Sequence, residues 1–159
     1  MSTEDKDLKV KVALKRYLGQ YYRAKIKRKQ LELRLKNFRE EMTGTQGVRY
    51  SPTSGVQAGS VSSTTEDAVI GAMEIEDRIV KQQAEVQRAM LAVMEFMDFL
   101  PIDSVERSIL EYRHIDCMSW KRICKEMCMT KTPCFKYYNQ GIDKLICKNE
   151  VIRILKTMH

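Results

Sequence analysis

Residues 131–140 include six side chains of the kinds that can bond to the edges of DNA bases. Lysine can donate to guanine, asparagine and glutamine can make two hydrogen bonds with adenine, and threonine or phenylalanine can touch the thymine methyl group. If this segment is a helix with Cys134, Gly141 and Ile142 facing inward, the six share its outer side. The candidate base contacts are Lys131, Thr132, Phe135, Lys136, Asn139 and Gln140.

A shorter basic segment precedes these residues. Its lysine and arginine side chains are suited to phosphate contacts, which position a protein on DNA without reading sequence. A serine at its start can cap a helix. The candidate phosphate contacts are Ser119, Lys121, Arg122 and Lys125.

Two amphipathic helices separated by a short turn must position both groups. The first has apolar residues at positions i, i+3, i+4 and i+7, and the second repeats a helical spacing after the turn at Cys128 and Met129. The predicted core of this motif is Trp120, Ile123, Cys124, Met127, Cys134, Tyr137, Ile142 and Leu145. Such a pair, with polar and basic residues outside, is typical of a helix-turn-helix that enters the major groove.

The caps of these helices can also be predicted. Asp103, with Glu106 three residues later, is expected to cap a helix before the pair. Thr130 is expected to cap the last helix, where Pro133 lies in the first turn. A left-handed backbone at Cys128 would be mildly strained, because that conformation favours glycine.

Other chemistries are weaker interpretations of the same residues. His114, Cys117, Cys124 and Cys128 could suggest a metal site, but their spacing matches no usual zinc pattern, so we expect none. We expect no cofactor, because the chain has no glycine-rich phosphate loop. The absence of a serine–histidine–aspartate set or paired carboxylates indicates that the protein is not an enzyme. Helical hairpins with polar outer faces that bind nothing remain an alternative.

Two long apolar stripes lie upstream. The first has steps of three and four and is interrupted only by Arg28: Val10, Leu14, Tyr17, Tyr21, Ala24, Arg28, Leu31, Leu35, Phe38 and Met42. The second has the same steps and is interrupted only by Gln82: Ala68, Ala72, Ile75, Ile79, Gln82, Val86, Ala89, Val93, Phe96 and Leu100. Such spacing predicts two long helices.

The predicted organisation has four parts: a basic N-terminal helix over 1–42, a flexible Gly/Ser/Thr-rich linker over 43–65, a long amphipathic helix over 66–100 and a helix-turn-helix DNA-binding domain over 101–159. Ser63 and Glu66 resemble a capping box for the long helix. Leu100 precedes Pro101, which ends that helix.

The two long helices are expected to form an antiparallel hairpin or coiled coil. Residues 1–42 hold 13 Lys/Arg against 6 Asp/Glu, while residues 43–100 hold 4 against 8. The basic helix therefore either pairs with the acidic one or binds DNA. Pairing Met42 with Ala68 would place Arg28 and Gln82 at one level, where we hypothesise a contact that fixes the register. A homodimer through the long helices is a further candidate.

Composition sets the remaining limits. The 159 residues carry a net charge of +7, which favours an anionic partner such as nucleic acid. No apolar run reaches the roughly 20 residues of a membrane span, and no signal peptide is evident, so we expect no membrane partner and a cytoplasmic location. The five cysteines are then expected to be reduced thiols.

The stretch ERSILEYRHIDCMSWKRICKEMCMTKTPCFKYYNQGIDKL resembles the C-terminal domain of phage- and prophage-encoded regulators of the RinA/ArpU type, and it is similar to region 4 of bacterial sigma factors. The matching residues are Glu106-Arg107, Leu110 with Tyr112-Arg113, Ser119-Trp120, Ile123-Cys124, the turn at Cys128, and Thr130 onward. Cys124 and Cys128 depart from the usual alanine and turn glycine.

This resemblance implies an all-α fold, a long helical hairpin followed by a sigma region 4-like bundle. It also implies sequence-specific binding to double-stranded DNA in a bacterial host cell, control of late packaging and morphogenesis genes, and contact with RNA polymerase. Two alternatives stay open: a small terminase-like packaging subunit and a coiled-coil scaffold that binds no DNA.

Overall fold

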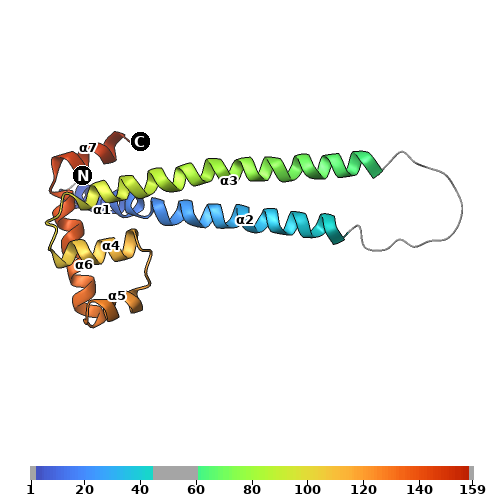
Figure 1. Cartoon of the computed structure of the whole chain (residues 1–159). Helices are drawn as coiled ribbons and strands as arrows, with labels where there is room; N and C mark the ends of the chain where they lie inside the picture. Colours follow the sequence, from blue (N-terminus) through green and yellow to red (C-terminus); the bar gives the residue numbers. More distant parts are fainter. Residues whose placement is uncertain (1–2, 45–60, 158–159) are drawn as a thin grey trace, which may run out of the picture. The chain divides into compact units, whose positions relative to one another are not determined.

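The computed structural model describes residues 3–44 and 61–157, which form helices and no strands. This confirms the predicted all-α class. In chain order the helices are α1 (Thr3–Leu18), α2 (Gln20–Gly44), α3 (Val61–Met97), α4 (Val105–His114), α5 (Trp120–Glu126), α6 (Lys131–Ile146) and α7 (Asn149–Thr157) (Figure 1). No helix within these residues is both long enough and apolar enough to span a bilayer.

The chain divides into two compact units. Unit 1 contains Met1–Ala24 and Val86–His159, and unit 2 contains Lys25–Glu85. Both α2 and α3 begin in one unit and continue into the other. This division differs from the predicted one, because α1 and the last turns of α3 belong to the same unit as the helix-turn-helix segment. No periodic signal indicates this packing, because it joins residues far apart in the chain.

Unit 1 has one continuous hydrophobic core. α1 packs against α6 and α7, and α4 packs against α5 and α6. Tyr17 of α1 stacks on Phe96 of α3 with ring centroids 4.3 Å apart. Leu14, Phe96 and Ile109 are completely buried in the cluster that these helices share. The N-terminal helix therefore completes the core of the C-terminal helices.

The predicted single helix from Val10 to Met42 is instead two helices that meet at Gly19. The backbone N–H of Gly19 still donates to the Lys15 carbonyl at 3.1 Å, and the N–H of Arg23 donates to the Gly19 carbonyl at 3.2 Å. Glycine weakens a helix at an interior position because it gains the most freedom when the chain leaves helical geometry. The spacing did not indicate this bend, because the apolar stripe continues in phase through it.

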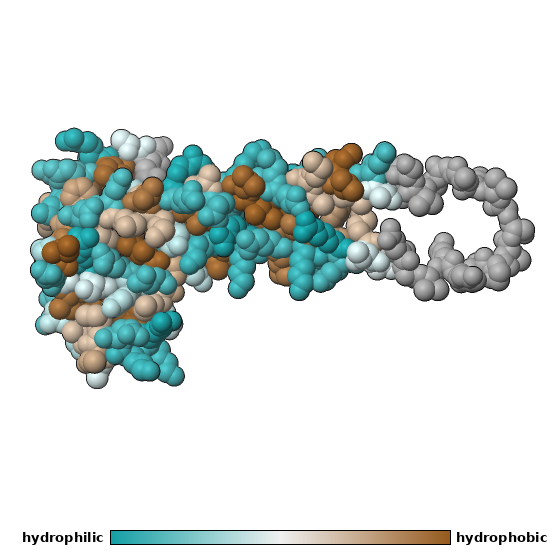
Figure 2. Space-filling view, in the orientation of Figure 1, coloured by the Kyte–Doolittle hydropathy of each residue, from teal (hydrophilic) through white to brown (hydrophobic). Residues whose placement is uncertain are grey.

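Unit 2 is an antiparallel helical hairpin of α2 and α3. Arg28 donates to the side-chain oxygen of Gln83, and Arg39 pairs with Glu76 further along. Arg28 thus bonds to the residue next to Gln82, so the register is close to the predicted one, and the contact with Gln82 itself stays a hypothesis. Gln82 itself is buried. Figure 2 shows apolar patches between hydrophilic residues along these helices.

The boundaries around α3 also differ from the prediction. The helix begins at Val61, so Ser63 lies inside its first turns and is not its cap. It ends at Met97, three residues before the predicted end at Leu100. Of the predicted linker over 43–65, residues 45–60 lie outside the described residues, and the remainder is helical.

Candidate nucleic-acid interface

Ser104 starts the three-helix segment that would carry the interface. Its hydroxyl accepts a hydrogen bond from the backbone N–H of Arg107 at 3.2 Å and donates to the Pro101 carbonyl at 2.8 Å. The prediction that Asp103 caps this helix was wrong by one residue, because Ser104 has the extended backbone of an N-cap. Glu106 does not complete a capping box and has another partner.

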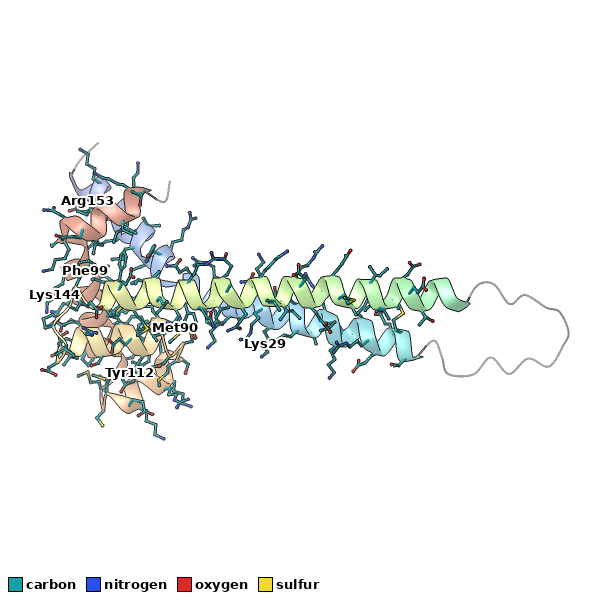
Figure 3. The ribbon with its side chains drawn as sticks, turned by 45° about the horizontal axis from the view of Figure 1, so that its top comes forward. Lys29, Met90, Phe99, Tyr112, Lys144 and Arg153 are labelled. Carbon is teal, nitrogen blue, oxygen red and sulfur yellow. The ribbon has the colours of Figure 1, made fainter. Side chains whose placement is uncertain are left out.

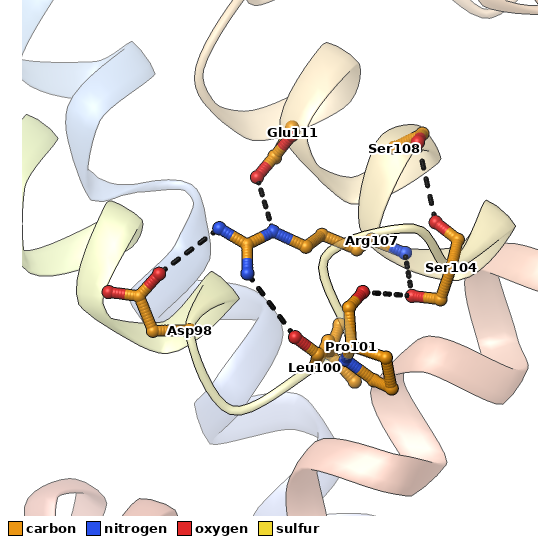
Figure 4. A network of polar contacts seen from close by, with 7 residues as sticks. All are labelled: Asp98, Leu100, Pro101, Ser104, Arg107, Ser108 and Glu111. Carbon is orange, nitrogen blue, oxygen red and sulfur yellow. Dashed lines mark hydrogen bonds and ion pairs between the residues drawn. The ribbon is translucent and has the colours of Figure 1, made fainter.

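Arg107 fixes the start of α4 to the end of α3 (Figure 4). Its guanidinium donates to Glu111 at 2.7 Å, to the Leu100 carbonyl at 3.2 Å and to Asp98 at 3.1 Å. These carboxylates raise the pKa of the arginine, with Glu111 the larger cause. Planar guanidinium groups hold several acceptors in fixed directions, so Arg107 sets the direction in which α4 leaves the preceding turn.

α4 and α6 approach closely at Gly141. A Cβ atom at this position would lie 2.7 Å from Cδ1 of Leu110 and 3.1 Å from Cβ of Glu106, so a larger residue would require the Leu110 side chain to move and α4 to shift slightly. Beside this contact, Lys144 donates to Glu106 at 2.7 Å, and that hydrogen bond is the main reason why the pKa of Glu106 is lowered. Tyr112 on α4 and Lys144 on α6 are labelled in Figure 3.

A buried histidine joins the same two helices. Nε2 of His114 lies 3.1 Å from the hydroxyl of Tyr138, and the two rings stack with centroids 5.8 Å apart. Burial lowers the pKa of His114 to about 4, and the charge of Arg113 acts in the same direction. The imidazole is therefore neutral near pH 7, where one ring nitrogen donates and the other accepts. Sequence reasoning gave His114 no structural role.

The turn between α5 and α6 is short and is held by backbone hydrogen bonds. Ser119 caps α5, as predicted, and accepts from the N–H of Arg122. At the other end, the N–H of Met129 donates to the Cys124 carbonyl at 2.9 Å, and that of Cys128 donates to the Lys125 carbonyl at 3.1 Å. This pair of bonds is a Schellman motif, which requires a left-handed residue directly after the C-cap.

Cys128 occupies that left-handed position with a φ of 51°. This is the left-handed conformation that the sequence led us to consider, in which a non-glycine residue incurs mild strain. Thr130 is the N-cap residue of α6, as predicted, but its side chain makes no capping hydrogen bond. The turn is therefore held mainly by backbone bonds from α5.

All eight predicted core residues of the motif belong to the unit 1 core. Four are buried: Ile123, Cys134, Ile142 and Leu145. Four are partly buried and pack against it: Trp120, Cys124, Met127 and Tyr137. Arg113 lies over the Trp120 ring at 5.2 Å and donates to the Met118 carbonyl at 2.9 Å, so it ties the loop before α5 to α4.

Most predicted base contacts lie on the exposed side of α6. Lys131, Thr132, Lys136 and Asn139 are exposed, whereas Gln140 is half-buried. Phe135 departs from the expected outward orientation, because its half-buried ring packs on Trp120 with centroids 4.2 Å apart. The large apolar ring gains more from that contact than from water. Lys131 lies above Phe135 at 5.6 Å.

The predicted phosphate contacts are all exposed on or beside α5: Ser119, Lys121, Arg122 and Lys125. Arg122 lies 4.0 Å from Glu126, which is the single acidic residue among residues 119–142. Five lysine or arginine residues occupy the same segment. The helix pair therefore presents a strongly basic surface, with uncharged hydrogen-bonding groups beside it on α6.

Two cysteines of this region, Cys134 and Cys124, pack in or against the core, whereas Cys128 is exposed. Burial, followed by a hydrogen bond with Cys124, raises the pKa of Cys134 to about 11, which keeps its thiol protonated. Among the described residues, no three histidine, cysteine or acidic side chains come together in a way that could hold a metal ion.

Comparisons of the chain with protein-family models, curated proteins and solved structures found no match.

Proposed function

We propose that the protein is a sequence-specific DNA-binding transcriptional regulator whose α6 enters the major groove of double-stranded DNA. The observation that carries this proposal is the α5–α6 pair: a tight Schellman turn, a buried inner face, and an outer face with five basic residues and one acid. Two helices joined in this way can place the start of the second helix in the major groove. Polar and basic side chains there can then bond to base edges.

The roles of individual residues follow from exposure and chemistry. Lys131, Thr132, Lys136 and Asn139 read base edges, with Gln140 at the margin of the surface. Ser119, Lys121, Arg122 and Lys125 contact phosphates and set the register. Phe135 supports Lys131 and touches a thymine methyl group only through the exposed edge of its ring.

We further propose a biological setting from the sequence resemblance to RinA/ArpU-type regulators. The protein would be encoded by a phage or prophage, act in the cytoplasm of the bacterial host, and control late packaging and morphogenesis genes in contact with RNA polymerase. It would not act as an enzyme. This setting is supported by the order of the Glu106–Leu145 motif residues, all of which fall within unit 1.

The test is selection of bound fragments from the parent genome, followed by affinity measurements over a range of salt concentrations. Lys136→Ala and Asn139→Ala should lower the preference for the selected site by about 1–3 kcal/mol each. Lys121→Ala should weaken binding to all sequences similarly and reduce the salt slope by about one.

Lys156→Ala is the matched control, because Lys156 is an exposed lysine of α7 in the same unit. It should leave both affinity and specificity unchanged. Retained specificity in both α6 variants would overturn the assignment of α6 as the reading helix. Selected sites beside packaging genes without a promoter would favour a terminase-like subunit, and no selected fragment would favour a scaffold.

A further inference from the structure

Unit 2 leaves its apolar side chains in contact with water. Among its described residues only Gln82 is buried, and no apolar residue is. Leu31, Leu35 and Phe38 on α2, which lie on the stripe predicted to face α3, are only half-buried. Two helices cannot enclose a core between them, because each covers only one side of the other. The hairpin therefore needs a further layer to exclude water from this stripe.

A second apolar stripe on α3 shows where such a layer would lie. Val69, Met73 and Val80 are separated by four and seven residues, so they share one side of the helix. They are 54%, 62% and 69% exposed. At about 100° per residue, this side lies roughly a third of a turn from the stripe that begins at Ala68, as in a helix with two packing partners.

The charges of the hairpin indicate what that layer is. From Lys25 to Gly44, α2 has seven basic and three acidic residues. From Val61 to Glu85, α3 has two basic and six acidic residues. Each hairpin thus has one helix of net charge +4 and one of −4. A twofold arrangement of two hairpins can place each basic helix beside the acidic helix of the other copy.

We propose that the α2–α3 hairpin is a dimerisation element, in which a second copy of this chain packs its basic α2 against the acidic α3 and covers Val69, Met73 and Val80. The aliphatic parts of the lysine and arginine side chains of α2 cover apolar surface while their charged ends meet the carboxylates of α3. The result is a four-helix bundle.

This inference does not depend on DNA binding, because it concerns different residues and a different unit. A monomer could still bind DNA, and a dimer could still fail to bind it. The two proposals can therefore fail separately.

The experiment measures the mass of the full chain by light scattering and sedimentation from about 1 to 100 µM, at low and high salt. The wild type should be a dimer that weakens as salt rises, because opposite charges attract across the interface. The double substitution Met73→Lys and Val80→Lys should weaken dimerisation by roughly 100-fold, because it places two cations against the basic helix of the other copy.

Ile70→Lys is the matched control. Ile70 is 56% exposed on the same helix, but it lies on the side opposite the Ala68 stripe, outside the proposed interface. It should leave the dimer intact. Equal helical circular dichroism in the wild type and all variants excludes unfolding as the cause.

A wild type that is monomeric at every concentration would overturn the proposal and would assign the exposed stripe to another protein. A dimer that survives the double substitution, or one that Ile70→Lys disrupts equally, would overturn the proposed interface. A ring of many copies would also contradict it, because the twofold arrangement closes at two.

Discussion

Unit 1 and unit 2 share two helices and the same kind of apolar spacing, yet they differ in what surrounds those stripes. All eighteen buried apolar residues of the described chain belong to unit 1, where Val93 and Phe96 at the end of α3 are completely buried. Ile75 and Ile79, on the same stripe of the same helix, are only half-buried in unit 2.

The difference shows that an apolar stripe allows a helix to pack but becomes buried only where other helices cover it. In unit 1, the last turns of α3 belong to a buried cluster to which α1, α4, α6 and α7 also contribute. In unit 2, the stripe has one helix opposite it. Truncating a single core side chain should therefore lower the stability of unit 1 strongly. The stability of unit 2 should depend more on whether another protein surface packs against the hairpin.

The largest effect is expected from Phe96→Ala. This substitution removes a buried ring that contacts Tyr17 and Phe99, and it should lower the free energy of unfolding of unit 1 by about 3–5 kcal/mol. Denaturant unfolding followed by the fluorescence of Trp120 measures the change. A loss below about 1 kcal/mol would contradict the view that one core holds α1, α3 and the C-terminal helices together.

The second effect is a pH dependence confined to unit 1. Because the pKa of His114 falls from 6.5 in the unfolded chain to about 4 in the folded one, the neutral side chain stabilises the fold above pH 6.5. That contribution, about 3 kcal/mol, is lost as the pH falls from 6.5 towards 4.

His114→Gln keeps a hydrogen-bonding partner for Tyr138 and removes the titration. Unfolding measured at several pH values should therefore show a steeper loss in the wild type than in the variant, since their carboxylates titrate alike. Parallel curves would show that the buried imidazole does not control the acid stability of this unit.

The smallest effect is expected from Leu35→Ala in unit 2. A half-buried leucine forfeits about half of its transfer free energy, or about 1 kcal/mol, when it is truncated in a hairpin without other partners. Thermal melting followed by circular dichroism measures it. A loss as large as that of Phe96→Ala would remove the contrast between the units, and a loss that grows with protein concentration would assign the missing cover to a second copy.

Periodicity predicted much of the fold because it reports on local geometry. The stripes on α2 and α3 correctly mark their less exposed sides, except at Met42, which is exposed. The cap at Ser119 and the position of the turn at Cys128 were also predicted, because caps and turns depend on neighbouring residues. The core of the α5–α6 pair followed from the same local reasoning.

The remainder depends on contacts between distant residues, which a single sequence does not display. Gly19 interrupts the first stripe without changing its phase, so the spacing did not indicate a second helix. The position of Phe135 in the helical repeat places it among the outward residues of α6. Its packing on Trp120 becomes evident only from the structure. Arg107 and His114 became recognisable as positioning residues once their partners on other helices were known.

The packing of α1 against α6 and α7 also has a consequence for the order of synthesis. Lys11 pairs with Asp143 at 2.6 Å, and Leu14 lies in the core with Val151 and Leu155. A ribosome releases α1 before the helices that cover it. The nascent chain must therefore carry a helix with an uncovered apolar side until α6 and α7 have been made, and a fragment that begins after α3 would lack the helix against which α6 and α7 pack.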